Sequence, residues 1–137
     1  MIDREKVLAT IDTAYAARRS GDMKALASVV AGNAVFELVG DKDLLSAFPA
    51  AGPMKLDDAA RVFHDFVALP QLDRLAVVVE GRRAAILWRA ELGFGDRAPF
   101  QTMLFDLWEL DSQGRIIALT QFADTGRIAQ EMAAFAA

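Results

Sequence analysis

The sequence contains no cysteine, which excludes disulfide bonds and metal sites built from thiolates. It contains a single histidine, His64, whereas most catalytic zinc and iron sites use several histidine ligands. We therefore expect no metal site and no cofactor. The lack of cysteine also agrees with a location in the reducing cytoplasm.

Long apolar runs and an excess of positive charge are also missing. No run approaches the ~20 apolar residues that a membrane-spanning helix needs, and the N-terminus lacks the apolar core of a signal peptide. The 15 Lys and Arg against 19 Asp and Glu give a net charge of -4, with the basic residues scattered. Such a surface repels a phosphate backbone on average. We expect a cytoplasmic protein with neither a membrane nor a nucleic-acid partner.

A chain of 137 residues is long enough for one domain with a sizeable core. Because no repeat, low-complexity tract or linker interrupts it, we expect a single domain over residues 1–137. Its first half has helical periodicity, with Gly21 and Pro70 as helix stops and Asp22 as a helix cap. The expected elements are helices over 3–19, 22–30 and 57–69, a short strand over 34–39 and an irregular loop over 40–53.

After Pro70 the apolar period changes to the alternation of strands. Four β-rich runs are separated by short turns rich in Gly and Asp, which join antiparallel neighbours into a meander. The runs cover 72–79, 83–94, 99–110 and 115–123, and a last helix is expected over 125–135. The pattern of helices followed by strands predicts an α+β fold.

The strand over 99–110 is apolar on both faces. Leu104 and Trp108 alternate with Met103 and Phe105, whereas a strand with one solvated face would alternate apolar with polar residues. The helices can cover one face of the sheet. The simplest cover for the other face is a second copy of the chain, so we expect a homodimer.

Asp106 is the strongest site candidate, because it shares the face of Leu104 and Trp108 on this strand. A carboxylate there loses hydration and needs either a strong partner or a raised pKa. The structural alternatives are an Asp exposed at a sheet edge or one bound to a backbone turn.

Arg89 and Glu91 share the polar face of the run over 83–94, whose other face is wholly apolar. Side chains two positions apart on a strand project side by side, so these two can pair or grip a polar ligand. Taken alone, the pattern slightly favours a solvated face with a surface ion pair. Gln121 lies on the face of the strand over 115–123 whose pattern points inwards. It is either a ligand contact or a core residue that makes a hydrogen bond.

His64 is the one side chain whose ordinary pKa suits acid–base work near neutrality. It is flanked by aromatic residues on the third expected helix, where the alternative is a half-buried structural histidine. Tyr15, the only tyrosine, falls on the buried face of the first helix. Its hydroxyl must find a partner there or reach a cavity.

In the order of its elements and in three stretches of sequence, the chain resembles the nuclear transport factor 2-like (NTF2-like) superfamily. The resemblance is greatest to the ketosteroid isomerase and SnoaL-like polyketide cyclase branch. The stretches are AARRSGDMKAL over 16–26, FDLWEL over 105–110 and GRIIALTQFADT over 114–125. The resemblance implies a cone-shaped α+β fold, in which the N-terminal helices pack on a curved antiparallel sheet that encloses a pocket, followed by a short C-terminal helix. The superfamily includes isomerases, cyclases, epoxide hydrolases, dehydratases and non-catalytic binders.

The resemblance also implies roles for single residues. Asp106 matches the isomerase aspartic acid that stays protonated and donates a hydrogen bond to the oxyanion. The isomerase's general base matches Leu38, which cannot accept a proton, and its oxyanion tyrosine matches Ala14, next to Tyr15. His64 lies near a position where the isomerase has a pocket tyrosine.

The chain is also similar to limonene epoxide hydrolase, and this similarity implies that the face of Arg89 and Glu91 points towards the pocket. The sequence pattern alone slightly favours a solvated face. These two residues match an Arg-x-Asp pair of that enzyme, and Gln121 matches its second carboxylate. The ligand-contacting residues expected besides Arg89 and Gln121 are Leu38, Phe63, Trp108 and Leu119.

These observations leave three hypotheses. The first is a cofactor-independent enzyme acting on a small hydrophobic, carbonyl-containing ligand by isomerisation, cyclisation or hydration, with Asp106, His64, Tyr15 and Glu91 as catalytic residues. The second is a binding module that uses the same pocket without chemistry. The third is a dimerisation domain whose pocket is filled by side chains.

Overall fold

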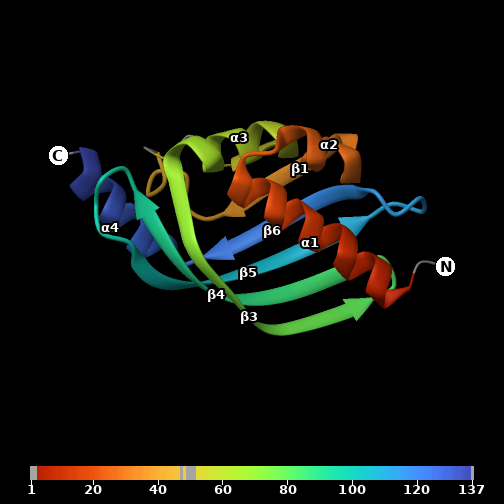
Figure 1. The fold of residues 1–137 in the computed structure, drawn as a ribbon. Coiled ribbons are helices and arrows are strands. Elements are labelled where there is room, and N and C mark those ends of the chain that lie inside the picture. The colour runs from red at the N-terminus through yellow and green to blue at the C-terminus, as the bar shows by residue number, and fades with distance from the viewer. Residues whose placement is uncertain (1–2, 47, 49–51, 137) are drawn as a thin grey trace.

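The computed structural model describes residues 3–46, 48 and 52–136, and its helices lie over a curved sheet (Figure 1). In chain order the elements are α1 (Arg4–Ser20), α2 (Met23–Val29), β1 (Val30–Val39), β2 (Gly52–Lys55), α3 (Leu56–Phe66), β3 (Val67–Glu80), β4 (Arg83–Phe94), β5 (Phe100–Leu110), β6 (Ile116–Ala123) and α4 (Thr125–Ala136). The six strands form one sheet in the order β2-β1-β6-β5-β4-β3.

The first two helices begin and end where the sequence predicts. The Asp3 side chain caps α1 by accepting a hydrogen bond from the backbone N–H of Lys6. Gly21 ends α1 in the left-handed conformation, at a φ of 78°. Asp22 then caps α2 through the N–H of Ala25.

The predicted meander is confirmed, because β3, β4, β5 and β6 pair in sequence as antiparallel neighbours. The sheet also contains β1, which runs parallel to β6 and begins earlier than the strand predicted over 34–39. The four-residue strand β2 pairs with β1 at the sheet edge. It lies within and just beyond the predicted loop over 40–53, whose residues 47 and 49–51 are outside the described part of the chain.

The expected end of the third helix at Pro70 is wrong. The helix ends at Phe66, and β3 begins at once because Val67 pairs with Phe94 of β4. Pro70 lies inside β3, which is an edge strand with a register irregularity between Ala68 and Gln71. A proline is tolerated there because an edge strand at a bulge does not require its N–H group.

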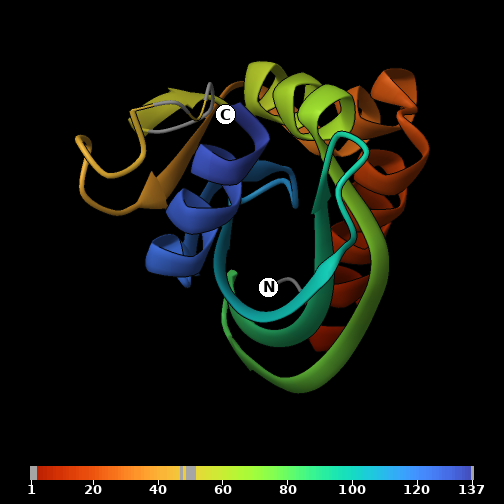
Figure 2. The same ribbon diagram turned by 90° about the vertical axis from the view of Figure 1, so that its left-hand side faces the viewer.

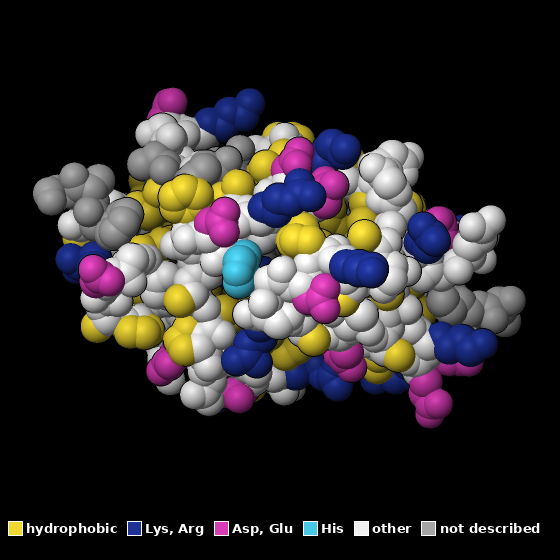
Figure 3. All heavy atoms as spheres, turned by 45° about the horizontal axis from the view of Figure 1, so that its top comes forward, with side chains coloured by type: hydrophobic (Ala, Val, Ile, Leu, Met, Phe, Trp, Pro, Cys, Tyr) yellow, Lys and Arg dark blue, Asp and Glu magenta, His cyan; other side chains and the backbone are white. Residues whose placement is uncertain are grey.

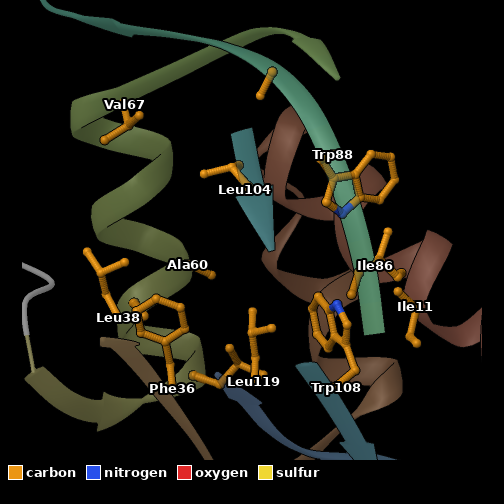
Figure 4. Packing of buried hydrophobic residues seen from close by; sticks show 14 of the residues in the cluster. Ile11, Phe36, Leu38, Ala60, Val67, Ile86, Trp88, Leu104, Trp108 and Leu119 are labelled. Atoms are coloured by element: carbon orange, nitrogen blue, oxygen red, sulfur yellow. The ribbon is translucent and has the colours of Figure 1, made fainter. Parts of the chain in front are cut away.

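The core lies between the helices and the inner face of the sheet. Seen from the end of the molecule, β3, β4 and β5 curl into a trough, with α1 and α3 on one side and α4 on the other (Figure 2). On β4, the residues that face inwards are buried, among them Ile86 and Trp88. The helices thus close over a concave, apolar sheet surface (Figure 4). Within the described residues, no helix has the length and apolarity needed to cross a membrane.

Candidate functional site

Asp106 lies on the inner face of β5 and is completely buried, with 0% of its surface exposed. No other polar or charged residue in the described part of the chain is buried to this degree. The strand register sets it between Ile86 of β4 and Gln121 of β6. The predicted placement of Asp106 inside the fold is therefore correct, and so is the inward orientation of Gln121.

Tyr15 of α1 donates a hydrogen bond from its hydroxyl to Oδ2 of Asp106. The same hydroxyl oxygen accepts hydrogen bonds from the indole Nε1 atoms of Trp88, at 2.8 Å, and Trp108, at 2.9 Å. Both indoles meet the phenol ring edge-on, with ring centroids 4.6 and 5.2 Å away. In Figure 4 the nitrogens of the two indoles lie on the sides of the rings that face each other.

The two indoles fix the direction of the bond between Tyr15 and Asp106. An indole N–H can only donate, and a tyrosine oxygen accepts two hydrogen bonds at most. With both acceptor positions taken by Trp88 and Trp108, the Tyr15 hydrogen must point at Asp106. Oδ2 of Asp106 is therefore always an acceptor, and a proton on this carboxyl group has to sit on Oδ1.

The Oδ1 atom of Asp106 accepts a hydrogen bond of 2.9 Å from Nε2 of Gln121. Burial raises the pKa of Asp106 to about 6, while the hydrogen bonds from Tyr15 and Gln121 act in the opposite direction. Burial, and then the charge of Asp106, raise the pKa of Tyr15 well above its ordinary value, so the phenol remains a neutral donor. Asp106 can therefore change its protonation state close to neutrality.

A cavity of about 90 Å³ opens beside Asp106, between the helices and the concave sheet. One buried water needs only ~10–15 Å³ of such space, so the cavity can hold a larger guest. Its walls include Leu38, Phe63, Trp108 and Leu119, whose contact with a ligand stays a prediction. The other described residues of its walls are also apolar, apart from Tyr15, Arg18, Asp106 and Gln121.

Arg18 is a pocket residue that the sequence-based reasoning did not single out. It is partly buried, donates from Nη2 to the carbonyl oxygen of Val67 at 2.9 Å, and lies 5.5 Å from the ring centroid of Phe63. Burial, assisted by the charge of Arg19, lowers its pKa to about 10. Helical spacing was an available signal, since Arg18 follows Tyr15 by three positions and so shares its face of α1.

The expected turn of Arg89 and Glu91 towards the pocket is wrong. The inward residues of β4 are Trp88, Ala90 and their neighbours at every second position, so the alternation of the strand sends Arg89 and Glu91 to the outer face. Arg89 is exposed and lies opposite Asp73 of β3 and Met103 of β5. Neither charged residue lines the cavity.

His64 does not line the cavity either, contrary to expectation. Its side chain is exposed on the helical face, where Figure 3 shows the imidazole of the chain's single histidine at the surface. The ring packs over Gly21, so closely that a Cβ atom at this glycine would lie 2.5 Å from Nε2 of His64. The histidine therefore contacts the connection between α1 and α2 instead of the pocket.

No group of three or more histidine or acidic side chains in the described residues is placed to hold a metal ion. The arrangement present is instead a carboxyl group on the wall of a largely apolar cavity, next to an amide donor. Such a pair can bind a polar atom of a ligand and exchange a proton with it.

No protein-family model matches the chain, and no curated protein matches it. Solved structures do match over nearly its whole length. An NTF2-like protein of unknown function from Burkholderia pseudomallei shares 14% identity over 93% of this chain and 97% of its own, with a TM-score of 0.78. A putative isomerase from Rhodopseudomonas palustris shares 21% identity over 98% and 99%, with a TM-score of 0.77.

An epoxide hydrolase of M. tuberculosis, described as LEH-like, shares 14% identity over 96% of both chains, with a TM-score of 0.70. Identities this low establish the fold and not the activity. The chain has the NTF2-like α+β fold, with helices packed on a curved, mixed sheet of six strands.

Replacing Asp106 by Asn should change how stability depends on pH. The pKa of Asp106 is about 6 in the folded protein, against 3.8 for an ordinary Asp. The folded state therefore binds the proton more tightly, and ionisation lowers the free energy of unfolding as pH rises between about 4 and 6. We expect wild type to lose about 2 kcal/mol relative to Asp106→Asn over this interval, and about 3 kcal/mol over the whole titration, from about pH 3 to about pH 7.

Urea unfolding of both proteins at a series of pH values measures this difference, and groups other than Asp106 cancel in the comparison. The exposed Asp96, changed to Asn, is the matched control and should follow wild type. Parallel stability curves for wild type and Asp106→Asn would contradict the assignment, as would a divergence of opposite sign.

Proposed function

We propose that this chain is a single SnoaL-like, ketosteroid isomerase-like domain over residues 1–137 that acts on a small hydrophobic carbonyl compound in the cytoplasm. In this proposal Asp106 carries the proton and no cofactor takes part. The observation that supports it best is the buried Asp106 carboxyl, with a pKa of about 6, in an otherwise largely apolar cavity. A base is most useful when its pKa lies near the working pH.

In the reaction we propose, ionised Asp106 removes a proton from the carbon next to the ligand carbonyl. The new O–H bond forms at Oδ1, because Oδ2 is held by Tyr15. The electron pair of the broken C–H bond passes into an enolate, and Gln121 donates its second amide hydrogen to the enolate oxygen. Return of the proton to a different carbon gives an isomer and restores Asp106.

This proposal reverses the role that the ketosteroid isomerase resemblance gives to Asp106. There the matching aspartic acid is a donor, whereas here Tyr15 and Gln121 both aim donors at the carboxyl group. Tyr15 cannot turn to a ligand without giving up the two indole bonds, so it holds the carboxylate. With Asp106 as the base, the leucine at position 38 is no obstacle, because Leu38 only needs to line the apolar cavity.

The same geometry removes other candidates from the proposal. His64 and Glu91 cannot move a proton inside the cavity, and Arg89 cannot hold a ligand carbonyl, because none of the three lines it. One titratable carboxyl group remains among the described cavity residues. A single base that removes and returns the proton fits isomerisation or enolate-driven ring closure better than water activation by a pair of acids.

A binding module without chemistry is the second candidate. One observation favours it: among the described residues, no buried side-chain nitrogen or oxygen lacks a hydrogen-bond partner. The fully buried polar atoms around Asp106 are thus already satisfied without a ligand. Two results with cyclohex-3-en-1-one would together support this candidate over the enzyme. The ketone would raise the thermal stability of the protein, and after long incubation it would be neither isomerised nor exchanged with deuterium.

The enzymatic proposal predicts isomerisation of cyclohex-3-en-1-one to its conjugated isomer, followed by ultraviolet absorbance. The rate should rise with pH through a midpoint near 6, as Asp106 ionises. Asp106→Asn should lower it by at least ~100-fold, because an amide cannot accept the proton. Tyr15→Phe should shift the midpoint upwards, because the carboxylate loses a donor.

His64→Ala and Arg89→Ala are the controls and should retain the wild-type rate, since both side chains are exposed. Unchanged turnover in Asp106→Asn, or its loss in His64→Ala, would contradict the proposed mechanism. Circular dichroism of each variant establishes that the fold is intact.

We also propose a homodimer through the outer face of the sheet. Large apolar side chains are exposed in register across three neighbouring strands there: Val39 lies opposite Phe122, and Phe122 opposite Phe105. The exposed fractions are 37%, 45% and 42%, respectively. Contiguous exposed apolar side chains of this kind mark interaction surfaces, and a second copy presents the same row to this one across a two-fold axis.

The substitution Phe105→Asp should convert the dimer into a monomer by burying a charge in the interface. Light scattering after gel filtration should then report the single-chain mass of 14.9 kDa in place of twice that value. Phe66→Asp is the control, because Phe66 is 53% exposed at the end of α3, away from the sheet face. A monomeric wild-type protein at tens of micromolar would overturn the dimer.

A further inference from the structure

Arg18 is the one cationic side chain among the described residues that line the cavity. It comes from α1, one helical turn beyond Tyr15, which binds Asp106. Three residues of helix span ~4.5 Å along the axis, so Arg18 and the Asp106 network border the same small space. A single small ligand can therefore reach both.

The hydrogen-bonding capacity of Arg18 is largely unused within the described part of the chain. A guanidinium group has five N–H donors. Arg18 makes one hydrogen bond to another described residue, from Nη2 to the Val67 carbonyl oxygen. Phe63, whose ring lies 5.5 Å away, offers a cation–π contact but no acceptor.

Arg18 also lacks a counter-ion in the described residues. No carboxylate oxygen of those residues lies within 4.0 Å of its guanidinium group, although several exposed arginines do have such a partner. Burial, and then the like charge of the neighbouring Arg19, lower the pKa of Arg18 to about 10. A partly buried cation with a like-charged neighbour gains most from an anion supplied from outside.

From this geometry we infer that the cavity selects ligands that carry a carboxylate, which pairs with the free edge of the Arg18 guanidinium. The planar fork of guanidinium N–H groups matches a carboxylate with two parallel hydrogen bonds. The rest of such a ligand is small and largely apolar, since the other described walls are apolar apart from the polar groups around Asp106. This inference rests on the proposed function, because the carboxylate at Arg18 sets the ligand's reactive carbon beside Asp106.

Matched acids and amides test the inference. The probes are phenylacetate with phenylacetamide, and 4-oxocyclohexanecarboxylate with its primary amide. Binding is measured by calorimetry at about pH 5.5, where carboxylic acids of ordinary pKa ~4 are ionised and Asp106, with a pKa of about 6, is mostly neutral. We expect each acid to bind wild type at least about tenfold more tightly than its amide.

The variants then assign that preference to one side chain. It should disappear in Arg18→Gln and persist, weakened, in Arg18→Lys, which keeps the charge but not the fork. The matched control is Arg19→Gln: Arg19 is the next residue of the same helix and also donates to a backbone carbonyl, that of Pro70, but it is exposed. Arg19→Gln should keep the full preference.

Equal binding of acids and amides by wild type overturns the inference, and so does a preference that survives in Arg18→Gln. If Arg18→Gln does not fold, NMR of wild type gives the answer. The Arg18 Nε–H resonance should shift when phenylacetate is added and stay in place with phenylacetamide, and the absence of a difference overturns the inference.

The result of the acid and amide binding test can be distinguished from the result of the isomerase assay. Isomerisation of cyclohex-3-en-1-one without any acid preference overturns the Arg18 site and leaves the proposed reaction standing. An acid preference without turnover of that ketone supports the Arg18 site and counts against the reaction.

Discussion

The hydrogen bond from Tyr15 to Asp106 is the interaction on which the site depends. A carboxylate inside an apolar cavity is costly unless fixed donors replace its water. Here the hydroxyl oxygen of Tyr15 accepts hydrogen bonds from the indole N–H groups of Trp88 and Trp108. The hydroxyl hydrogen of Tyr15 therefore points at Asp106. The site is therefore polarised before any ligand arrives, with its donors aimed at Asp106.

The fold brings these side chains together from distant parts of the sequence. Tyr15 and Asp106 are 91 positions apart, on the first helix and the second-last strand. Adjacent antiparallel strands set Trp88, Asp106 and Gln121 on one concave face, and α1 packs across that face. The same helix supplies Arg18 one turn later, so one helix–sheet contact positions both polar features of the cavity.

The sequence predicted those features that follow from local periodicity. Alternation along β5 was enough to place Asp106 inside, and capping and turn residues located α1, α2 and the meander. Alternation along β4 also gave the correct outward orientation of Arg89, which the family resemblance wrongly overruled. Three other features depend on tertiary contacts: the end of α3, the packing of His64 on Gly21 and the pairing of Tyr15 with Asp106. Local pattern does not encode such contacts.

The most direct test of this account is an NMR titration of the Asp106 carboxyl carbon, assigned by its loss in Asp106→Asn. The account predicts a midpoint near 6, because burial opposes the ionised form while Tyr15 and Gln121 support it. A midpoint at or below the ordinary 3.8 would contradict it, because the cavity would then impose no cost on the charge. A carboxyl group that stays protonated throughout the neutral range would contradict it equally, because Asp106 would then be a permanent donor and no base.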